Sequence, residues 1–403
     1  MPAQPAHSLS VPVVIVGGGP AGLLLSHLLA SEGVESLVLE SRSRARIEAT
    51  HRAGILEQGS VRLLAETGVS DRVHRDGHEH RGINLRVGGV SHRIDFQRLA
   101  GASTWLYPQT EVFVDLADAR ERDGGEVLFE VTDTEVDGLA TPTPRVRFTQ
   151  GGEAREVTCE VVVGADGSRS MCRDLVPKGE RRRFGRTYPF AWFGILAEAP
   201  MSSQELIYTH SERGFALISS RTETLQRMYF QCDPNANPDT WADEAIWAEL
   251  QARVSGHDGL ELAEGPIVER SVLPFRSFVQ EPMRHGRLVL AGDAAHTVPP
   301  TGAKGLNLAL RDVEILAQEL PRALRQGGAM PALDDYSARA LARVWKAQHF
   351  SYWMTTMLHR PDGDPEQVDF DVRRSIGEIE TLVDSEAGRR YLAEGYTGWP
   401  TTP

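Results

Sequence analysis

The sequence predicts an α/β protein, in which a Rossmann-like nucleotide-binding unit is interrupted by an inserted antiparallel sheet and followed by a helical region. Three observations predict this fold. A glycine-rich turn joins a strand-like run to a helical run near the N-terminus. Two later strand-like runs are followed by a glycine and an aspartate, Gly164 with Asp166 and Gly292 with Asp293, and several strand-like segments fill residues 181–269. The chain has 403 residues, above the roughly 250–300 at which one core stops growing, so more than one packed unit is expected.

The nucleotide-binding unit begins with VPVVIVGGGPAGLLLSHLLASEGVESLVLE, residues 11–40. A β-branched run leads into Gly17, Gly19 and Gly22, and a helical pattern and a second strand ending at Glu40 follow. Glycines at this spacing permit a tight turn and close approach of the backbone to a pyrophosphate at the helix N-terminus. Glu40 stands near the offset of about 20 residues at which an acid accepts from a ribose hydroxyl. The segment indicates a dinucleotide, either NAD or FAD.

Two later segments favour FAD. VTCEVVVGADGSRSMCR (157–173) and RLVLAGDAAH (287–296) each place a carboxylate, Asp166 or Asp293, directly after a strand-like run. Carboxylates at the ends of neighbouring strands suit the hydroxyls of an extended ligand. FAD, which carries a ribityl chain as well as a ribose, is such a ligand.

The pattern divides the chain into three parts. We expect residues 1–180 and 270–325 to form a discontinuous nucleotide-binding domain, residues 181–269 to form an inserted antiparallel-sheet domain for the substrate, and residues 326–403 to form a helical region. The last part contains LARVWKAQHFSYWMTTMLHR, an aromatic-rich segment that suits a core or a subunit interface.

Composition excludes several classes of function. The formal net charge of −13 argues against nucleic acid as a partner. No apolar run approaches the ~20 residues that a membrane span requires, and residues 1–10 lack the features of a signal peptide. The three cysteines, Cys159, Cys172 and Cys232, lack zinc-ligand spacing, which predicts free thiols, no metal and a cytoplasmic location.

The motifs GGGPAG, GADGSR and GDAAH, in this order, resemble the flavoprotein aromatic hydroxylases, which bind FAD in the fold named for glutathione reductase. Further segments extend the resemblance over nearly the whole chain, toward members that act on 4-hydroxybenzoate: RAGILEQG (52–59), YPQTEV (107–112), ELIYTHSERGFAL (205–217), PFRSFVQEPM (274–283) and SEAGRRYLAEGYTGWP (385–400). The resemblance implies a homodimeric monooxygenase that converts 4-hydroxybenzoate to 3,4-dihydroxybenzoate with FAD, NADPH or NADH, and O2, through a flavin hydroperoxide.

The segment HTVPPTGAKGLN (296–307) reads as the cradle for the flavin ring. Proline has no amide donor, so Pro299 and Pro300 predict an extended loop whose carbonyls can accept hydrogen bonds. The residues that follow present amides at a helix N-terminus, where the negative charge of a reduced flavin is favoured. The predicted cradle comprises Pro300, Gly302, Ala303, Lys304, Gly305, Leu306 and Asn307.

The resemblance assigns further FAD contacts. It places Glu40 on the adenosine ribose, Arg52 on the pyrophosphate, Gln109 near the ribityl and phosphate groups, and Asp293 on the ribityl chain. Without its RAGILEQG context, Arg52 would be read as a surface charge.

For the substrate, Arg221 can grip a carboxylate with two hydrogen bonds, and the resemblance adds Ser219 and Tyr229 as hydroxyl donors. Arg227 is the next candidate for this clamp. At the phenol end the resemblance places Tyr208, backed by Tyr396. It adds His80, expected to have a near-neutral pKa, as the group through which the proton reaches solvent. The carbonyl of Pro300 would approach the same substrate oxygen.

The electron donor has no glycine fingerprint of its own. Arg169, Arg173 and Arg276 match positions that the family uses for the donor's phosphates, and Arg42 and Arg46 lie where a 2′-phosphate would be recognised. Ser41 and Thr50 stand where arginines are found in NADPH-specific members, so NADPH and NADH both remain open, and the loop arginines can equally be solvated surface charges.

Two alternatives remain open from the sequence. Met228 replaces an aromatic residue of the family pattern, which keeps open a related hydroxylase for a ring-substituted 4-hydroxybenzoate, such as an amino or second hydroxy derivative. The other alternative, from a different class, is a flavin-binding interaction protein without turnover. The set of Ser219, Arg221, Tyr229, Tyr208 and Tyr396 argues against it.

Overall fold

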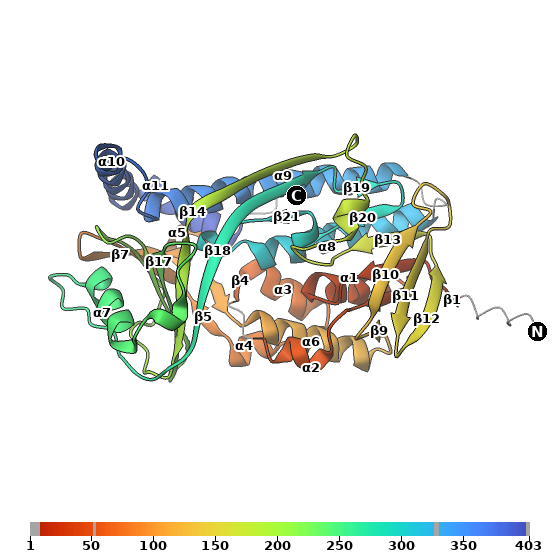
Figure 1. Cartoon of the computed structure of the whole chain (residues 1–403), viewed down its shortest axis with the longest axis horizontal. Helices are drawn as coiled ribbons and strands as arrows, with labels where there is room; N and C mark the ends of the chain where they lie inside the picture. Colours follow the sequence, from red (N-terminus) through yellow and green to blue (C-terminus); the bar gives the residue numbers. More distant parts are fainter. Residues whose placement is uncertain (1–8, 51–53, 326–329, 400–403) are drawn as a thin grey trace, which may run out of the picture.

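A six-stranded sheet forms the centre of the nucleotide-binding unit (Figure 1). The computed structural model describes residues 9–50, 54–325 and 330–399. The strand order is β19-β20-β13-β2-β3-β9. These strands are β2 (Val13–Val16), β3 (Ser36–Leu39), β9 (Glu126–Leu128), β13 (Val161–Gly164), β19 (Arg284–His285) and β20 (Leu288–Leu290). All neighbours are parallel except β19 and β20, so the central strands read as continuous apolar runs because both of their faces are covered.

Helices and a second sheet cover this centre. Helix α1 (Pro20–Ser31) packs beside α8 (Gly305–Arg325) and α6 (Gln109–Arg122). A four-stranded sheet, β1-β12-β11-β10, contributes Val146, Phe148 and Val157 to the same core. Its strands are β1 (Leu9–Ser10), β10 (Thr132–Asp137), β11 (Arg145–Gln150) and β12 (Glu153–Thr158). Shorter elements line the same unit: α2 (Arg44–Glu48), α3 (Gln58–Glu66), α4 (Arg72–Asp76), and the sheet of β4 (Ile55–Glu57), β8 (Thr104–Leu106) and β5 (His78–His80).

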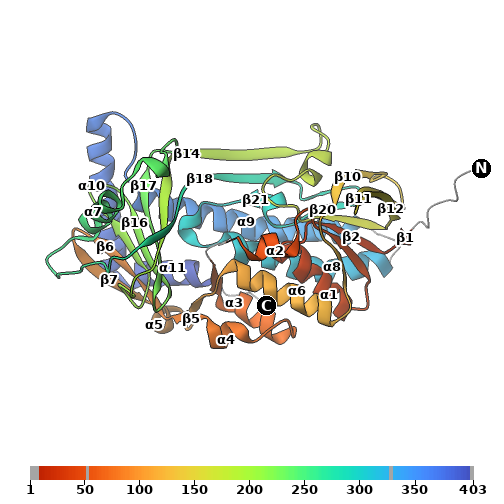
Figure 2. The same ribbon diagram turned by 60° about the horizontal axis from the view of Figure 1, so that its bottom comes forward.

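The second large sheet has eight strands in the order β21-β18-β14-β17-β16-β15-β6-β7. They are β6 (Gly82–Val87), β7 (Val90–Asp95), β14 (Arg182–Ala197), β15 (Ile207–His210), β16 (Ala216–Thr222), β17 (Leu225–Cys232), β18 (Ile267–Glu281) and β21 (His296–Thr297). Strands β14 and β18 are long antiparallel partners that reach back along the nucleotide-binding unit (Figures 1 and 2). The sheet also includes residues 82–95, which the sequence analysis assigned to the first domain, and the domain boundaries remain a prediction.

The two faces of this sheet pack in separate cores because successive residues of a strand point to opposite faces. One face packs against α7 (Asp243–Val254) around Phe193, Ile218 and Phe230. The other face packs against α9 (Met330–Leu358), α11 (Glu386–Thr397) and α5 (Phe96–Ala100) around Trp192, Tyr208 and Tyr396. Helix α10 (Pro365–Asp384) contacts both α9 and α11. The second face therefore holds the residues that the sequence analysis assigned to the substrate.

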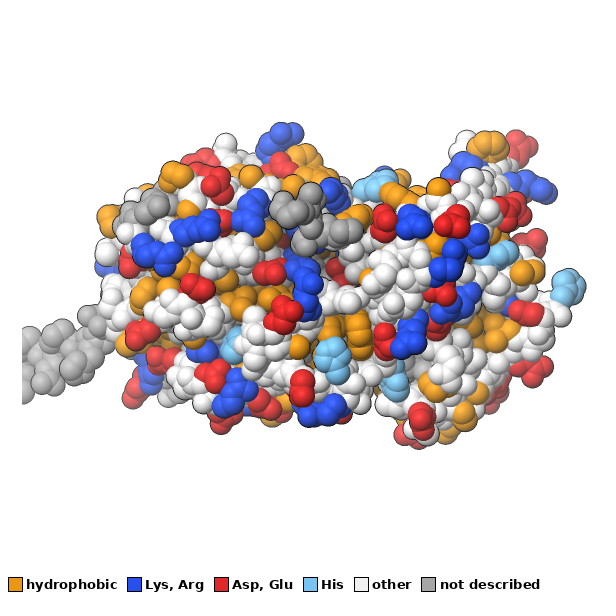
Figure 3. Space-filling model, turned by 180° about the vertical axis from the view of Figure 1, so that it is seen from behind, with side chains coloured by type: hydrophobic (Ala, Val, Ile, Leu, Met, Phe, Trp, Pro, Cys, Tyr) orange, Lys and Arg blue, Asp and Glu red, His pale blue; other side chains and the backbone are white. Residues whose placement is uncertain are grey.

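Charges of both signs are mixed over the surface face seen in Figure 3, so the acidic excess forms no single field there. Among the described residues, no helix combines the length and the apolar character that crossing a bilayer requires. Within the same part of the chain, no group of three or more His, Cys, Asp or Glu side chains is arranged to hold a metal ion.

A buried histidine joins α9 to the eight-stranded sheet. His359 stacks on Phe190 and Phe215 at ring-centroid distances of 4.6 and 4.3 Å. Its Nδ1 lies 2.8 Å from the carbonyl oxygen of Thr355, and its Nε2 accepts from Trp192 Nε1 at 2.7 Å. Since Nε2 is an acceptor, Nδ1 carries the proton of a neutral ring. Burial lowers the pKa of His359 to about 3.

We expect His359 to make the protein sensitive to acid. The unfolded chain binds a proton on this histidine near its ordinary pKa of about 6.5, whereas the folded state does so near 3, so the stabilisation is complete above about pH 6.5 and is lost as the pH falls toward 3. Between pH 7 and 5 the loss should be about 2 kcal/mol. Urea unfolding at both pH values, compared with His359→Gln, measures it. An amide can replace both hydrogen bonds but does not titrate, and equal pH dependence in the two proteins would contradict this assignment.

Candidate active site

The glycine-rich turn after β2 is held against two neighbouring segments. Gly17 has φ +112°, a conformation that favours glycine, and a Cβ there would lie 2.2 Å from the carbonyl oxygen of Ala165. At Gly22, helix α1 packs so closely on the glycine-rich loop that a Cβ would lie 1.9 Å from the carbonyl oxygen of Gly17. The backbone is therefore open toward a ligand at the N-terminus of α1.

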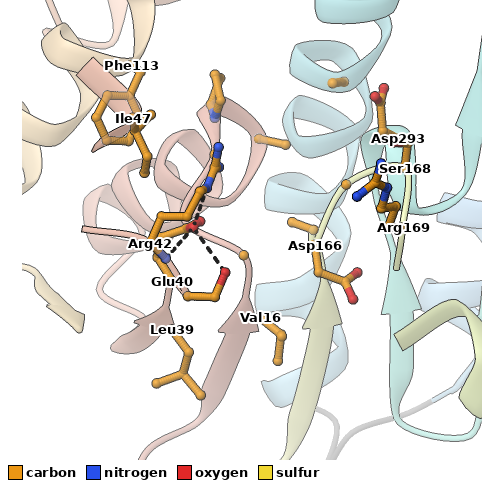
Figure 4. A pocket seen from close by; sticks show the side chains of 18 of the residues that line it. Val16, Leu39, Glu40, Arg42, Ile47, Phe113, Asp166, Ser168, Arg169 and Asp293 are labelled. Atoms are coloured by element: carbon orange, nitrogen blue, oxygen red, sulfur yellow. Dashed lines mark hydrogen bonds and ion pairs between the residues drawn. The ribbon is translucent and has the colours of Figure 1, made fainter. Parts of the chain in front are cut away.

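Glu40 follows β3 and is almost completely buried beside this turn. Its Oε2 accepts from the backbone N–H of Gly18 at 2.9 Å. Its Oε1 accepts from both the backbone N–H and Nε of Arg42, each at 3.0 Å. Figure 4 shows Arg42 folded over Glu40. Arg42 therefore belongs to the Glu40 cluster in this structure, and its predicted contact with the electron donor remains untested.

A cavity of about 1050 Å³ runs from this turn to the ends of β13 and β20. Its lining includes Gly17, Gly19, Glu40, Gln109, Asp166, Arg169, Asp293, Gly305 and Leu306. Figure 4 shows Glu40 and Arg42 on one side of it and Asp166, Arg169 and Asp293 on the other. The glycine-rich turn, the buried carboxylate of Glu40 and the carboxylates at the other end of the cavity fit an extended dinucleotide such as FAD. Arg52, the predicted pyrophosphate contact, lies outside the described residues.

Asp166, the aspartate after β13, makes contacts within its own turn. Asp166 accepts from Ser170 Oγ at 2.5 Å and from the backbone N–H of Cys172 at 3.0 Å, so it also stabilises its own turn. Nearby, Arg173 is buried and donates to the carbonyl oxygens of Ser168 at 2.9 Å and Ala294 at 3.3 Å. Arg173 thus joins the turns after β13 and β20 from inside the protein. Arg169 and Arg276 are exposed at the same end.

The expected flavin loop lies between β21 and α8. Pro300–Gly302 form a short 3-10 turn, and Ala303 follows with φ 53°. Asn307 fastens this loop to β4: its Oδ1 accepts from the Glu57 N–H at 2.9 Å and its Nδ2 donates to the carbonyl oxygen of Ala303 at 2.9 Å. Thr355 Oγ1 of α9 donates to Thr301 Oγ1 at 2.9 Å. The loop is supported from two sides.

Lys304 has a role that the sequence analysis missed, because it considered only the backbone amide of this residue. The residue is 1% exposed, and its Nζ donates to Glu57 Oε1 at 2.6 Å and to the carbonyl oxygen of Tyr396 at 2.8 Å. Burial lowers the pKa of Lys304, and Glu57 opposes this effect. One sequence feature could have indicated this ion pair: Glu57 lies in the RAGILEQG segment, which the sequence analysis had already singled out.

Two tyrosines meet on the face of the eight-stranded sheet that packs against α9 and α11. The hydroxyls of Tyr208 on β15 and Tyr396 on α11 lie 2.7 Å apart, and both side chains are fully buried. Burial raises the pKa of Tyr208 and of Tyr396, so both keep their protons at neutral pH. The pair can therefore pass a proton along one hydrogen bond.

Arginines lie on the same sheet face as Tyr208. Arg227 donates to Tyr229 OH at 3.1 Å and pairs with Glu269 at 3.0 Å. Arg221 differs, because its Nη2 is buried and makes no hydrogen bond to any described residue. Burial, and then the like charge of Arg227, lower the pKa of Arg221. A buried guanidinium nitrogen without a hydrogen-bond partner is costly, so Arg221 suits an anion supplied from outside.

Comparisons with known proteins agree with this geometry. Residues 10–351 match the family described as FAD binding domain. The p-hydroxybenzoate hydroxylase of Acinetobacter baylyi is 42% identical over 395 residues, which cover 98% of this chain and 96% of that protein. This chain is an FAD-dependent aromatic hydroxylase.

Two further similar proteins share less sequence with this chain. A 6-methylpretetramide 4-monooxygenase of Streptomyces rimosus is 30% identical over 89% of this chain and 86% of its own length. Among solved structures, a p-nitrophenol 4-monooxygenase of Pseudomonas putida has a TM-score of 0.79 and 20% identity, over 98% of this chain and 100% of that one. This last similarity supports the fold of the hydroxylase alone. The predictions of an FAD-binding α/β fold and of the hydroxylase family are confirmed.

Met228 is where the structure contradicts the sequence analysis. The side chain is completely buried among Ile207, Ile218 and Phe230, on the face of the sheet that packs against α7. Its neighbour Tyr229 points to the opposite face, with Tyr208. Met228 therefore does not line a pocket bounded by Tyr208 and Tyr229, and at that position it gives no support to a ring-substituted substrate.

Two other expectations change in detail. His80 was expected to have a near-neutral pKa, but burial lowers its pKa to about 4 because the side chain is only 4% exposed. Ser219 was expected to donate to the substrate, but its Oγ donates to the carbonyl oxygen of Arg227 at 2.7 Å. The polar segment HRDGHEHRG around His80 gave no sign that this histidine is buried.

We expect Gly19→Ala to weaken FAD binding without disturbing the fold. Gly19 lines the cavity, and a Cβ there would meet no protein atom within 4 Å. A cofactor phosphate that passes this turn would meet the added methyl group. The dissociation constant of FAD, measured by flavin fluorescence, should rise at least about tenfold, or 1.4 kcal/mol.

Gly179→Ala is the matched control, since a Cβ at Gly179 also has nothing within 4 Å, and Gly179 is exposed and does not belong to the cavity lining. Both FAD-free variants should unfold with wild-type stability to within about 0.5 kcal/mol. Equal FAD affinity in the two variants would show that the cofactor does not pass Gly19.

Proposed function

We propose that this hydroxylase converts 4-hydroxybenzoate to 3,4-dihydroxybenzoate with O2 and with NADPH or NADH as the electron donor. The proposal rests on Nη2 of Arg221, which is buried and makes no hydrogen bond to any described residue. Arg221 lies on the same sheet face as Tyr208. An aromatic acid with a phenol opposite its carboxylate can bind Arg221 at one end and Tyr208 at the other. The name and 42% identity of the Acinetobacter baylyi relative support this substrate.

The spacing along the sheet supports a single benzene ring between these groups. Tyr208 is in register with Leu217, which lies four residues before Arg221 on β16. At about 3.3 Å per residue, the two side chains leave the sheet about 13 Å apart. Long side chains that lean toward each other from these positions leave room for one ring with a polar group at each end.

Each end of the site would have a separate task. Arg221 would hold the carboxylate with a bidentate hydrogen bond, and Tyr229, whose hydroxyl already accepts from Arg227, can donate its own hydrogen. Tyr208 would donate to the phenolate oxygen, while Tyr396 and His80 would carry the phenol proton away. When bound in the cavity, FAD supplies the oxygenating chemistry, and an ionised phenol makes the substrate ring electron-rich toward it.

The flavin ring would rest on residues 300–307, the loop that Lys304, Asn307 and Thr355 support. The backbone amides at the start of α8 would face its electron-rich edge. Arg169 and Arg276 are the exposed arginines at this end that suit the transient phosphates of the donor.

We further propose a cytoplasmic homodimer, as the family resemblance implies. The three cysteines form no disulfide, which suits a reducing compartment. Helices α9, α10 and α11 carry the exposed side chains Trp345, Tyr352, Phe370 and Tyr391, which suit a contact between subunits.

We expect the purified protein to contain FAD and to oxidise NADPH or NADH slowly until 4-hydroxybenzoate is added. Product formation and NAD(P)H oxidation, followed over a panel of hydroxybenzoates, measure this.

Arg221→Ala should weaken 4-hydroxybenzoate binding by about 2–5 kcal/mol, as for loss of one partner of a desolvated charge pair, and leave FAD content unchanged. Oxidation that is equally fast without any aromatic acid, or normal binding by Arg221→Ala, would contradict the proposal.

Tyr208→Phe separates binding from activation. A phenol has a pKa near 10, so bringing it to about 7.5 requires about 2.5 units, or roughly 3.4 kcal/mol. One hydrogen bond to a charged group contributes about 1.5–3 kcal/mol, which is most of that shift. The variant should bind 4-hydroxybenzoate and consume NAD(P)H, but should show no phenolate absorbance and divert most oxygen to hydrogen peroxide. Full product yield per NAD(P)H would exclude Tyr208 as the phenolate-stabilising group.

A further inference from the structure

The surroundings of His80 contain a carboxylate that the proposed relay has not used. His80 ends β5, next to the first residues of β6, and is almost completely buried. Receiving a proton there creates a charge in a desolvated place, which burial opposes. Glu205 is the carboxylate whose field raises the pKa of His80 against this effect, while the neighbouring His78 lowers it.

Glu205 is held in place by a two-point ion pair. Arg93 on β7 donates from Nε to Glu205 Oε2 and from Nη2 to Glu205 Oε1, both at 2.8 Å, and from Nη1 to Asp95 at 2.7 Å. The pair lies directly on Gly82, where a Cβ would be 3.1 Å from Arg93 Nη2 and 3.2 Å from Glu205 Oε2. Gly82 is two residues beyond His80, so the pair lies over the end of the segment that carries the histidine.

A surface hollow adjoins the ion pair. It has a volume of about 450 Å³ and is lined by Arg81, Arg93, Asp95 and Gln97. The Glu205 side chain is 15% exposed, whereas the whole of His80 is 4% exposed. Glu205 and Arg93 are therefore closer to solvent than the buried histidine.

The other charges around His80 are already engaged elsewhere. Glu79 accepts from Ser103 Oγ at 2.7 Å and pairs with Arg81 at 3.0 Å. Asp95 caps α5 through the backbone N–H of Arg98 at 2.9 Å. Of the carboxylates named here, Glu205 is the one whose negative charge raises the pKa of His80.

We propose that Glu205, paired with Arg93, is the positioning residue at the solvent end of the proton relay: its carboxylate stabilises the transient imidazolium of His80. The proton leaves the phenol of the substrate, passes Tyr208 and Tyr396 to His80, and goes from His80 to water or buffer in the hollow. This inference rests on the proposed hydroxylation of 4-hydroxybenzoate. It concerns the rate at which the proton leaves and not the affinity for the substrate.

The test is stopped-flow mixing of the FAD-loaded protein with 4-hydroxybenzoate in weak buffer, with a pH indicator for proton release and absorbance for the phenolate. We expect Glu205→Gln to slow both signals about five- to twentyfold and to slow them more as the pH rises. The final phenolate fraction and the dissociation constant of the substrate should be unchanged. Glu205→Asp should restore most of the rate.

Two further variants exclude a merely structural effect. Glu79→Gln removes a neighbouring, equally arginine-paired carboxylate and should leave the rate within twofold of wild type. Arg93→Gln removes the counter-charge but keeps the Glu205 carboxylate, so the rate should rise. If Glu205→Gln does not fold, this variant decides, because an unchanged rate would then overturn the inference.

A wild-type rate in Glu205→Gln, equal slowing in Glu79→Gln, or a fivefold loss in Arg93→Gln would overturn the inference. Absence of any phenolate or proton release in the wild-type protein would instead overturn the proposed function.

Discussion

The buried ammonium group of Lys304 is the interaction on which the arrangement of the site depends. It joins three segments far apart in the sequence: β4 through Glu57, the loop before α8 through its own backbone, and α11 through the carbonyl oxygen of Tyr396. Its charge lies over the rings of Phe350, Tyr396 and Trp399 at 5.1 to 5.8 Å. An uncompensated cation at this depth would cost several kcal/mol, so the three segments are favoured only together.

This arrangement couples the two ends of the proposed chemistry. The backbone that would cradle the flavin and the tyrosine that would carry the phenol proton share one hydrogen-bonded cation. Thr355, which supports the same loop, lies one helical turn before His359, whose ring is packed between Phe190 and Phe215. Through Thr355 and His359, one helical turn apart, the C-terminal part of α9 contacts both the loop and the eight-stranded sheet.

Sequence reasoning succeeded where chemistry depends on local pattern. The glycine turn, the carboxylate of Glu40 and the strand-end aspartates follow from spacing, and they predicted the dinucleotide-binding fold. It failed where the position of a side chain depends on which element packs against each face of a strand. Met228 and Tyr229 are neighbours in sequence but lie on opposite faces of the sheet, and no local pattern told which face would hold the substrate. Burial of His80 and of the Lys304 side chain is likewise set by distant segments, β8 and α11, that the local sequence does not reveal.

Strand β20 belongs beside β13 in the central sheet, yet the whole antiparallel sheet except β21 is encoded before it. During synthesis on a ribosome, the edge of β13 that pairs with β20 therefore stays unpaired until residues 288–290 emerge. Such an edge is a template for pairing with other chains, and pairings between distant segments form slowly. The order of the gene thus makes the half-made chain the vulnerable form of this protein, and α11, which completes the tyrosine pair, is among the last segments to arrive.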